Sequence, residues 1–348
     1  MLLYSFRRLA RIVVVSSLVI IVIGCVRPFR QSVLTSATPR QFEGGTLQLQ
    51  EYWRLRVTVW PSAPRMVASG GLLVFVPLVP QRFMLRAVGM EDGRDKWQIL
   101  EDTPYIIRAL AAGHEHIFVG QDREVRAYQI ANGQLSWTRP LSIPDRVSYS
   151  FRVTPSELQV YAHSGGSSEI YNLDTARGDL SSVSRVHDNP NQEARILESD
   201  GQEYWLNDRG GHYTLRSVNT TSGQLNWEWA MPGSFKYIPE IIEQRMYLNF
   251  GTEIVGLDLS EGHPVWSMSA DAEIVSNLAL GEHEGCFLQK DIILTCLDLS
   301  NGNTMGQVQF HPTLVPPHTE DYWVLIHKKI VLIYFGDSGE IIALGPSR

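Results

Sequence analysis

One short motif recurs along this chain and constrains its fold more than any other feature. Its fullest copy, residues 256–266, reads GLDLSEGHPVW. The central glycine returns at intervals of 39 to 45 residues, as Gly93, Gly133, Gly178, Gly223, Gly262 and Gly302. Four positions after the glycine the chain carries Trp97, Trp137, Ser182, Trp227, Trp266 and Gly306. A motif at a fixed period indicates a chain built from repeated structural units.

The residues just before each glycine alternate in polarity. Apolar or β-branched residues stand five and three positions before it, as Leu257 and Leu259 do around Asp258. A period of two marks a strand with one buried face. The Asp/Asn/Ser-Gly type residues that follow favour a tight turn, and the tryptophan then lies on a second strand.

Each unit is long enough for four short strands. In the copy that ends at Trp137, the predicted strands are 106–110, 117–119, 125–128 and 135–137, separated by turns. Four strands in about 40 residues are typical of a β-propeller blade rather than of a helical repeat. We expect the tryptophan at the end of each copy to pack between neighbouring blades, where its large ring is buried.

The last copy lacks its final strand. Residues 339–344 match the strand that leads into the motif, and the chain then ends before the next glycine. Residues 47–57 contain Trp53 and lie one repeat before the first full copy. We therefore predict that this N-terminal strand completes the C-terminal blade and closes the ring, which leaves no long edge strand exposed.

The expected fold is all-β: a seven-bladed β-propeller of four-stranded antiparallel blades, spanning residues 47–348. Eight blades would follow if a degenerate blade lay within 303–348. The third copy is the weakest, because Ser182 replaces tryptophan and the loop 186–193 follows it. Long loops on rigid scaffolds often carry binding sites.

The N-terminus differs from the rest of the chain. Three arginines, at positions 7, 8 and 11, precede an apolar run over 12–24 that ends in Val-Ile-Gly-Cys at Cys25. The run is too short for an ordinary membrane span, which needs about 20 residues, and fits an export signal. We interpret residues 1–25 as a signal with a lipobox and Cys25 as the lipid attachment site. The alternative is an uncleaved anchor. Residues 26–46 show no periodicity and are predicted to form a tether.

Composition narrows the function classes. The chain is 44% hydrophobic and 19% charged, as in a folded globular protein. Its net charge is −7, and its three N-terminal arginines lie outside the predicted propeller. An acidic body argues against nucleic acid as a partner.

Few residues in the sequence suggest a catalytic or metal-binding site. His114, Glu115 and His116 could bind a metal ion, but they fall in a predicted hairpin turn, so we expect a solvated turn and no metal site. No Ser/His/Asp set or phosphate loop stands out in the sequence. We expect no catalytic residues and no cofactor.

Two cysteines lie on strands joined near residues 290–291. With a two-residue turn, Cys286 and Cys296 would point to opposite faces, and with a three-residue turn they would face each other. Because Cys296 occupies a column of small residues, buried free thiols are the favoured interpretation.

The pattern small-Leu-Asp-Leu-x-x-Gly-x-x-x-Trp resembles the tryptophan-docking repeat of pyrroloquinoline-quinone-like (PQQ-like) propellers, over residues 50–348. That family includes quinoprotein dehydrogenases and also BamB-like exported lipoproteins, which are non-enzymatic and bind proteins through their loops. The alcohol-type dehydrogenases carry an adjacent cysteine pair, whereas the three cysteines here, Cys25, Cys286 and Cys296, are far apart.

The resemblance implies a non-enzymatic, monomeric propeller, exported and attached to the membrane of a bacterial cell envelope through its N-terminus. It would serve as a protein-interaction scaffold for other envelope proteins, in envelope or outer-membrane protein assembly. The alternatives are a PQQ-dependent dehydrogenase and a propeller that senses a small ligand.

Overall fold

The structure is a computed structural model of the chain. It describes residues 34–35, 41–42, 49–57, 66–77, 82–101, 107–121, 123–142, 148–164, 167–187, 193–237, 239–290, 292–309, 322–336 and 339–346. The chain divides into two units, 1–33 and 34–348, and every described residue belongs to the second. The predictions for residues 1–25, including Cys25, lie outside the described residues. Within these ranges, no helix is long and apolar enough to cross a membrane.

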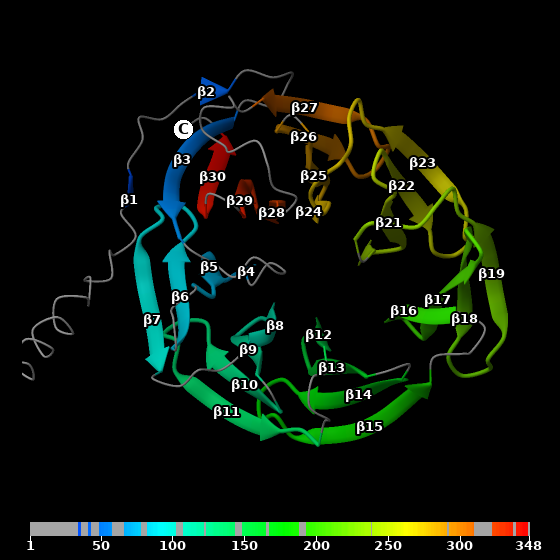
Figure 1. Cartoon of the computed structure of the whole chain (residues 1–348), viewed down its shortest axis with the longest axis horizontal. Coiled ribbons are helices and arrows are strands. Elements are labelled where there is room, and N and C mark those ends of the chain that lie inside the picture. Colours follow the sequence, from blue (N-terminus) through cyan, green and yellow to red (C-terminus); the bar gives the residue numbers. More distant parts are fainter. Residues whose placement is uncertain are drawn as a thin grey trace, which may run out of the picture. The chain divides into compact units, whose positions relative to one another are not determined.

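The second unit consists of seven antiparallel sheets arranged in a ring (Figure 1). We number these blades 1 to 7 along the chain. In blades 1 to 6 the first strand lies toward the centre of the ring and the last lies at its rim, and in blade 7 β28 lies toward the centre and β3 at the rim (Figure 1). The predicted seven-bladed propeller is confirmed, and the eight-bladed alternative is wrong.

Blades 1 to 3 follow one another along the chain. Blade 1 comprises β4 (Met66–Ser69), β5 (Leu72–Phe75), β6 (Phe83–Gly89) and β7 (Asp95–Glu101). Blade 2 comprises β8 (Ile107–Ala112), β9 (His116–Gln121), β10 (Glu124–Gln129) and β11 (Leu135–Pro140). Blade 3 comprises β12 (Ser148–Val153), β13 (Glu157–Ser164), β14 (Ser167–Asp174) and β15 (Leu180–His187).

Blades 4 to 6 repeat the same order. Blade 4 comprises β16 (Glu193–Ser199), β17 (Gln202–Arg209), β18 (His212–Asn219) and β19 (Leu225–Ala230). Blade 5 comprises β20 (Glu240–Ile242), β21 (Arg245–Asn249), β22 (Glu253–Asp258) and β23 (Pro264–Ser269). Blade 6 comprises β24 (Ala279–Leu280), β25 (Glu284–Gln289), β26 (Ile293–Asp298) and β27 (Thr304–Gln309).

Blade 7 joins the two ends of the propeller, as predicted. Its strands are β28 (Tyr322–His327), β29 (Ile330–Phe335), β30 (Glu340–Pro346) and β3 (Leu49–Arg56). β3 pairs antiparallel with β30, with Trp53 opposite Ala343 and Leu55 opposite Ile341. Two short strands from the segment predicted as a tether, β1 (Leu34–Thr35) and β2 (Gln41–Phe42), pair with the other edge of β3. The outer edge of the closing strand is therefore paired near both of its ends.

Burial follows the position of a strand within its blade. Central strands are covered on both faces by neighbouring blades, so β25 is buried almost along its whole length. Rim strands alternate between exposed and covered residues, as in β23, where Trp266 is buried between exposed neighbours. This difference explains why apolar runs and alternating runs both occur in the sequence.

Apolar clusters fill the spaces between blades. The described residues form six buried clusters, and each is shared by two neighbouring blades: 1 and 2, 2 and 3, 4 and 5, 5 and 6, 6 and 7, and 7 and 1. Among the described residues, no such cluster joins blade 3 to blade 4. That junction is the exception in an otherwise regular ring.

Candidate functional site

The tryptophans of the repeat link neighbouring blades. At five junctions the indole N–H donates a hydrogen bond to a backbone carbonyl in the turn of the next blade. These bonds are Trp53 to Met90 O (2.6 Å), Trp97 to Ile130 O (2.7 Å), Trp137 to Thr175 O (3.1 Å), Trp227 to Leu259 O (2.7 Å) and Trp266 to Leu299 O (3.0 Å). Burial of the indole ring stabilises the junction, and the hydrogen bond from its N–H fixes the orientation of the ring.

The repeated glycines make room for these rings. The indoles lie against Gly93, Gly133, Gly178, Gly262 and Gly302 of the next blade. At Gly178, which has a φ of +70°, a Cβ atom would stand 2.5 Å from Cε3 of Trp137. Glycine is therefore required there both by the left-handed backbone and by the neighbouring ring.

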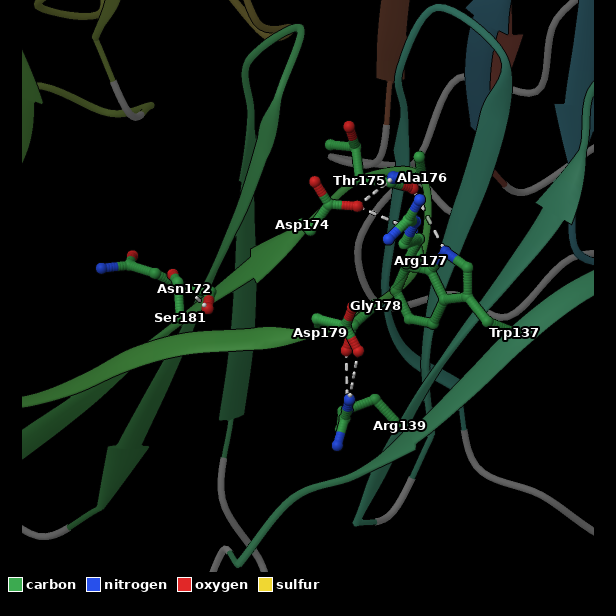
Figure 2. Close-up of polar contacts among 10 residues, drawn as sticks. All are labelled: Trp137, Arg139, Asn172, Asp174, Thr175, Ala176, Arg177, Gly178, Asp179 and Ser181. Carbon is green, nitrogen blue, oxygen red and sulfur yellow. Dashed lines mark hydrogen bonds and ion pairs between the residues drawn. The ribbon is translucent and has the colours of Figure 1, made fainter.

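Figure 2 shows the contact between blades 2 and 3. Besides the Trp137 bond to Thr175, Arg139 donates from Nε to the carbonyl of Gly178 at 2.6 Å. Arg139 also forms an ion pair with Asp179 at 3.3 Å. The repeat pattern does not predict Arg139, because the residue two positions after the tryptophan is apolar in most copies, as in Ile99 and Met268.

The repeated aspartates stabilise the turns on which the rings dock. Asp174 accepts hydrogen bonds from the backbone N–H groups of Ala176 and Arg177 at 3.0 and 2.8 Å (Figure 2). Asp258 accepts from the hydroxyl and backbone N–H of Ser260, and these bonds lower the pKa of its carboxyl. Bonds to Ser300 likewise lower the pKa of Asp298. Carboxylates held in this way are turn residues rather than candidate catalysts.

Two junctions lack a tryptophan. At the end of blade 6, Gly306 replaces the tryptophan. The facing blade 7 has no turn between its last two strands for a ring to dock on, because β30 and β3 are not consecutive in the chain. An apolar cluster fills this junction instead. Ser182 replaces the tryptophan at the end of blade 3, and a Cβ on the facing Gly223 would have no atom within 4 Å. The junction between blades 3 and 4 therefore has neither a docked ring nor a shared cluster among the described residues.

The residue opposite each docked tryptophan is small. The tryptophans pair across their strands with Ala87, Ala127, Ser217, Gly256 and Ala343. Ser182 instead faces the larger Asn172, whose Nδ2 donates to the Ser182 hydroxyl at 2.8 Å. The missing ring and the larger facing residue thus occur together.

The two-histidine segment lies at a turn, as the sequence suggested. His114 and Glu115 are exposed between β8 and β9, and His116 Nε2 lies 3.0 Å from Ser136 Oγ. The residues that the structure describes contain no group of three or more His, Cys, Asp or Glu side chains able to hold a metal ion.

The interpretation of the cysteines as free thiols is wrong. Cys286 and Cys296 form a disulfide bond between β25 and β26, and both are buried. Residues 290–292 join the strands, so the connection has three residues and the two side chains share one face. The two cysteines are directly paired, with their Cα atoms 4.1 Å apart. The sequence left the length of this turn open, and its length of three residues is what brings the two cysteines together.

Residues 48–195 match the family model described as Outer membrane protein assembly factor BamB. Over these residues the chain is similar to the PQQ-like β-propeller repeat family. No curated protein matches the sequence of this chain.

Several solved structures match this chain at low sequence identity, and two of them, with TM-scores above 0.5, show the same fold. BamB from Moraxella catarrhalis is 12% identical, with 90% of this chain and 100% of that chain covered and a TM-score of 0.48. The computationally designed Ika8 protein is 12% identical, with 84% and 98% covered and a TM-score of 0.53. A chain of the mitotic checkpoint complex is 11% identical, with 93% and 99% covered and a TM-score of 0.58. Likeness at this level extends to the fold alone.

Proposed function

We propose that this PQQ-like propeller is a non-enzymatic, membrane-tethered scaffold that binds other proteins outside the cytoplasm during outer-membrane protein assembly. The observation that carries the proposal is the match of residues 48–195 to the family model of an outer-membrane assembly factor. The partners would be other proteins of the cell envelope.

The architecture suits a scaffold. Five tryptophan contacts hold neighbouring blades together, and the β3–β30 pairing closes the ring within blade 7. Turns on such a frame keep fixed positions, so binding a partner does not require the entropy cost of ordering them. Rigid presentation of loops supports protein binding and needs no catalytic group.

Two features support a location outside the cytoplasm. The buried Cys286–Cys296 disulfide is the kind of bond that persists in an oxidising compartment. The arginines and apolar run before Cys25 have the order of an export signal. In this proposal, lipid on Cys25 attaches the propeller to the membrane.

Affinity capture tests the proposal directly. The full chain would be cross-linked in native membranes, purified and analysed by quantitative mass spectrometry, with an unrelated envelope lipoprotein carrying the same tag as the control. We expect specific enrichment of outer-membrane assembly proteins, and lower levels of folded outer-membrane β-barrel proteins when the gene is deleted. Unchanged barrel levels and no enrichment over the control would contradict the proposal.

The dehydrogenase alternative has its own test. A quinoprotein would carry a quinone that absorbs near-ultraviolet light and would reduce dyes with alcohols or sugars. We expect the purified chain, incubated with pyrroloquinoline quinone and Ca²⁺, to show neither bound quinone nor dye reduction. Either signal would overturn the non-enzymatic assignment.

A further inference from the structure

A cavity of about 650 Å³ opens where blades 3, 4 and 5 meet. Its walls come from β12 and β13, from β16, and from the residues leading into β20. It adjoins the junction at which the tryptophan is replaced and no shared apolar cluster occurs among the described residues. Cavities of this size accommodate small organic ligands.

Much of the cavity wall is aromatic or aliphatic. Phe151 and Tyr161 contribute from blade 3, Leu197 from blade 4, and Phe235 and Ile241 from the approach to and start of blade 5. Phe151 also packs against Gly120 of blade 2, and Leu197, Phe235 and Ile241 also pack against the apolar cluster of blades 4 and 5. Each is only partly buried, so part of its surface is left to line the cavity. A ligand with an apolar body would remove that surface from water, at a gain of about 25 cal/mol per Å².

Two opposite charges lie in the same wall. Arg152 on β12 is partly buried, and Glu240 begins β20. In the part of the chain that the structure describes, neither side chain forms a hydrogen bond or an ion pair. Although solvent reaches the Glu240 side chain, the surrounding protein desolvates its carboxyl and raises its pKa to about 7. An ammonium group beside Glu240 would favour its ionised form, and a carboxylate beside Arg152 would accept charge-assisted hydrogen bonds from the guanidinium.

We infer that this cavity binds a small zwitterion with an apolar body, such as a short aromatic peptide, whose carboxylate pairs with Arg152 and whose ammonium pairs with Glu240. The two wall charges explain why a zwitterion fits better than a ligand with one charge. The aromatic side chains explain the preference for an apolar body. This site is independent of the proposed scaffold role, because it depends only on residues of the cavity.

Isothermal titration calorimetry with three matched probes tests the inference. The dipeptide Phe-Phe carries both charges, its C-terminal amide carries only the ammonium, and its N-acetyl form carries only the carboxylate. With the full chain, we expect Phe-Phe to bind at least about tenfold more tightly than either singly charged probe, as one added charged pair would give.

Charge-neutralising variants assign each end of the ligand. Glu240→Gln should reduce Phe-Phe affinity about tenfold while leaving the N-acetyl probe unaffected. Arg152→Gln should also reduce Phe-Phe affinity about tenfold, and it should leave the affinity of the amide probe unchanged. Glu228→Gln and Arg177→Gln alter exposed residues outside the cavity wall and serve as controls with unchanged affinity.

Three results would overturn the inference. These are the absence of Phe-Phe binding at millimolar concentration, equal affinity for all three probes, and equal losses in the cavity and control variants. Circular dichroism of each variant verifies that it is folded, so that a loss of binding reports on the site.

Discussion

A Cβ atom on Gly133 would lie 2.7 Å from Cε3 of Trp97, the indole that docks from the preceding blade. Gly133 also has a φ of +73°, a left-handed conformation that side chains rarely adopt. The glycine therefore meets two requirements, one set by its own backbone and one set by the neighbouring ring. Gly223 has a similar φ of +67° but faces no atom within 4 Å, so it meets only the first.

This contrast predicts different effects for the same substitution. Gly223→Ala should destabilise the fold by about 1 to 2 kcal/mol, the cost of left-handed backbone. Gly133→Ala should lose roughly 1 to 3 kcal/mol more, because the added methyl group collides with the Trp97 ring. Urea unfolding followed by tryptophan fluorescence measures both values. Equal losses would show that the ring does not constrain the glycine.

The sequence predicts the regular part of this fold because each repeated residue has a local physical task. The glycine supplies a left-handed turn, the aspartate accepts the turn N–H groups, and the tryptophan spans the junction. Trp53 lies one repeat before Trp97, so even the closure of blade 7 could be predicted from spacing. The glycine recurs in six copies and the docked tryptophan at five junctions, and this repetition makes the fold visible in the sequence.

The irregular part could not be predicted in the same way. Arg152 and Glu240 belong to no repeat column, and only the packing of three blades brings them into one cavity. The replacement by Ser182 was visible, but its consequence depends on what faces Gly223 in space. The disulfide was not predicted because it depends on whether two or three residues join β25 to β26, which the sequence leaves open.

The weak junction can be repaired by substitution. Ser182 occupies the same register as the docked tryptophans, but Asn172 opposite it is larger than the residues that face them. We expect Ser182→Trp alone to give little gain, and Ser182→Trp with Asn172→Ala to stabilise the fold by about 1 to 3 kcal/mol through ring burial against Gly223.

Unfolding by urea and a crystal structure of the double variant are the measurements. In the structure, the new indole should donate to the carbonyl of Thr220, which corresponds to Thr175 in the preceding blade. If the double variant is no more stable than the wild type, the open space at Gly223 is not what weakens the junction.

The disulfide should stabilise blade 6. It closes a short loop, with a sequence separation of 10 residues. The chain-entropy estimate for a loop of this length is about 3 kcal/mol. We expect the free energy of unfolding of the double variant, Cys286→Ala with Cys296→Ala, to be lower by about that amount. A reducing agent should lower the stability of the wild type and leave that of the variant unchanged. Identical unfolding curves with and without reductant would contradict this.

Stability should fall in acid because of the turn aspartates. Hydrogen bonds from Ser260 and Ser300 hold the pKa of Asp258 and Asp298 below the ordinary value, so the folded state keeps these carboxylates ionised more readily than the unfolded chain does. Their contribution is present above the unfolded pKa of about 4 and is lost as the pH falls through the folded pKa.

Urea unfolding from about pH 7 to pH 2 would measure this effect. Asp258→Asn with Asp298→Asn should give a shallower loss of stability below about pH 4, because the amide does not titrate. Ser260→Ala removes a hydroxyl donor to Asp258 and should also reduce the slope. A double variant with the wild-type slope would show that other carboxylates dominate acid unfolding.

The N-terminal interpretation is tested by fatty-acid labelling. If Cys25 is the lipidated residue, cells grown with a labelled fatty acid will yield a labelled chain. Cys25→Ser will abolish the label because Cys25 is the cysteine directly after the apolar run. The variant lacking Cys286 and Cys296 retains Cys25 and should remain labelled, which makes it the matched control. An unlabelled wild-type chain that stays in the membrane fraction would favour the uncleaved anchor. A label that persists in Cys25→Ser would place the lipid on another residue.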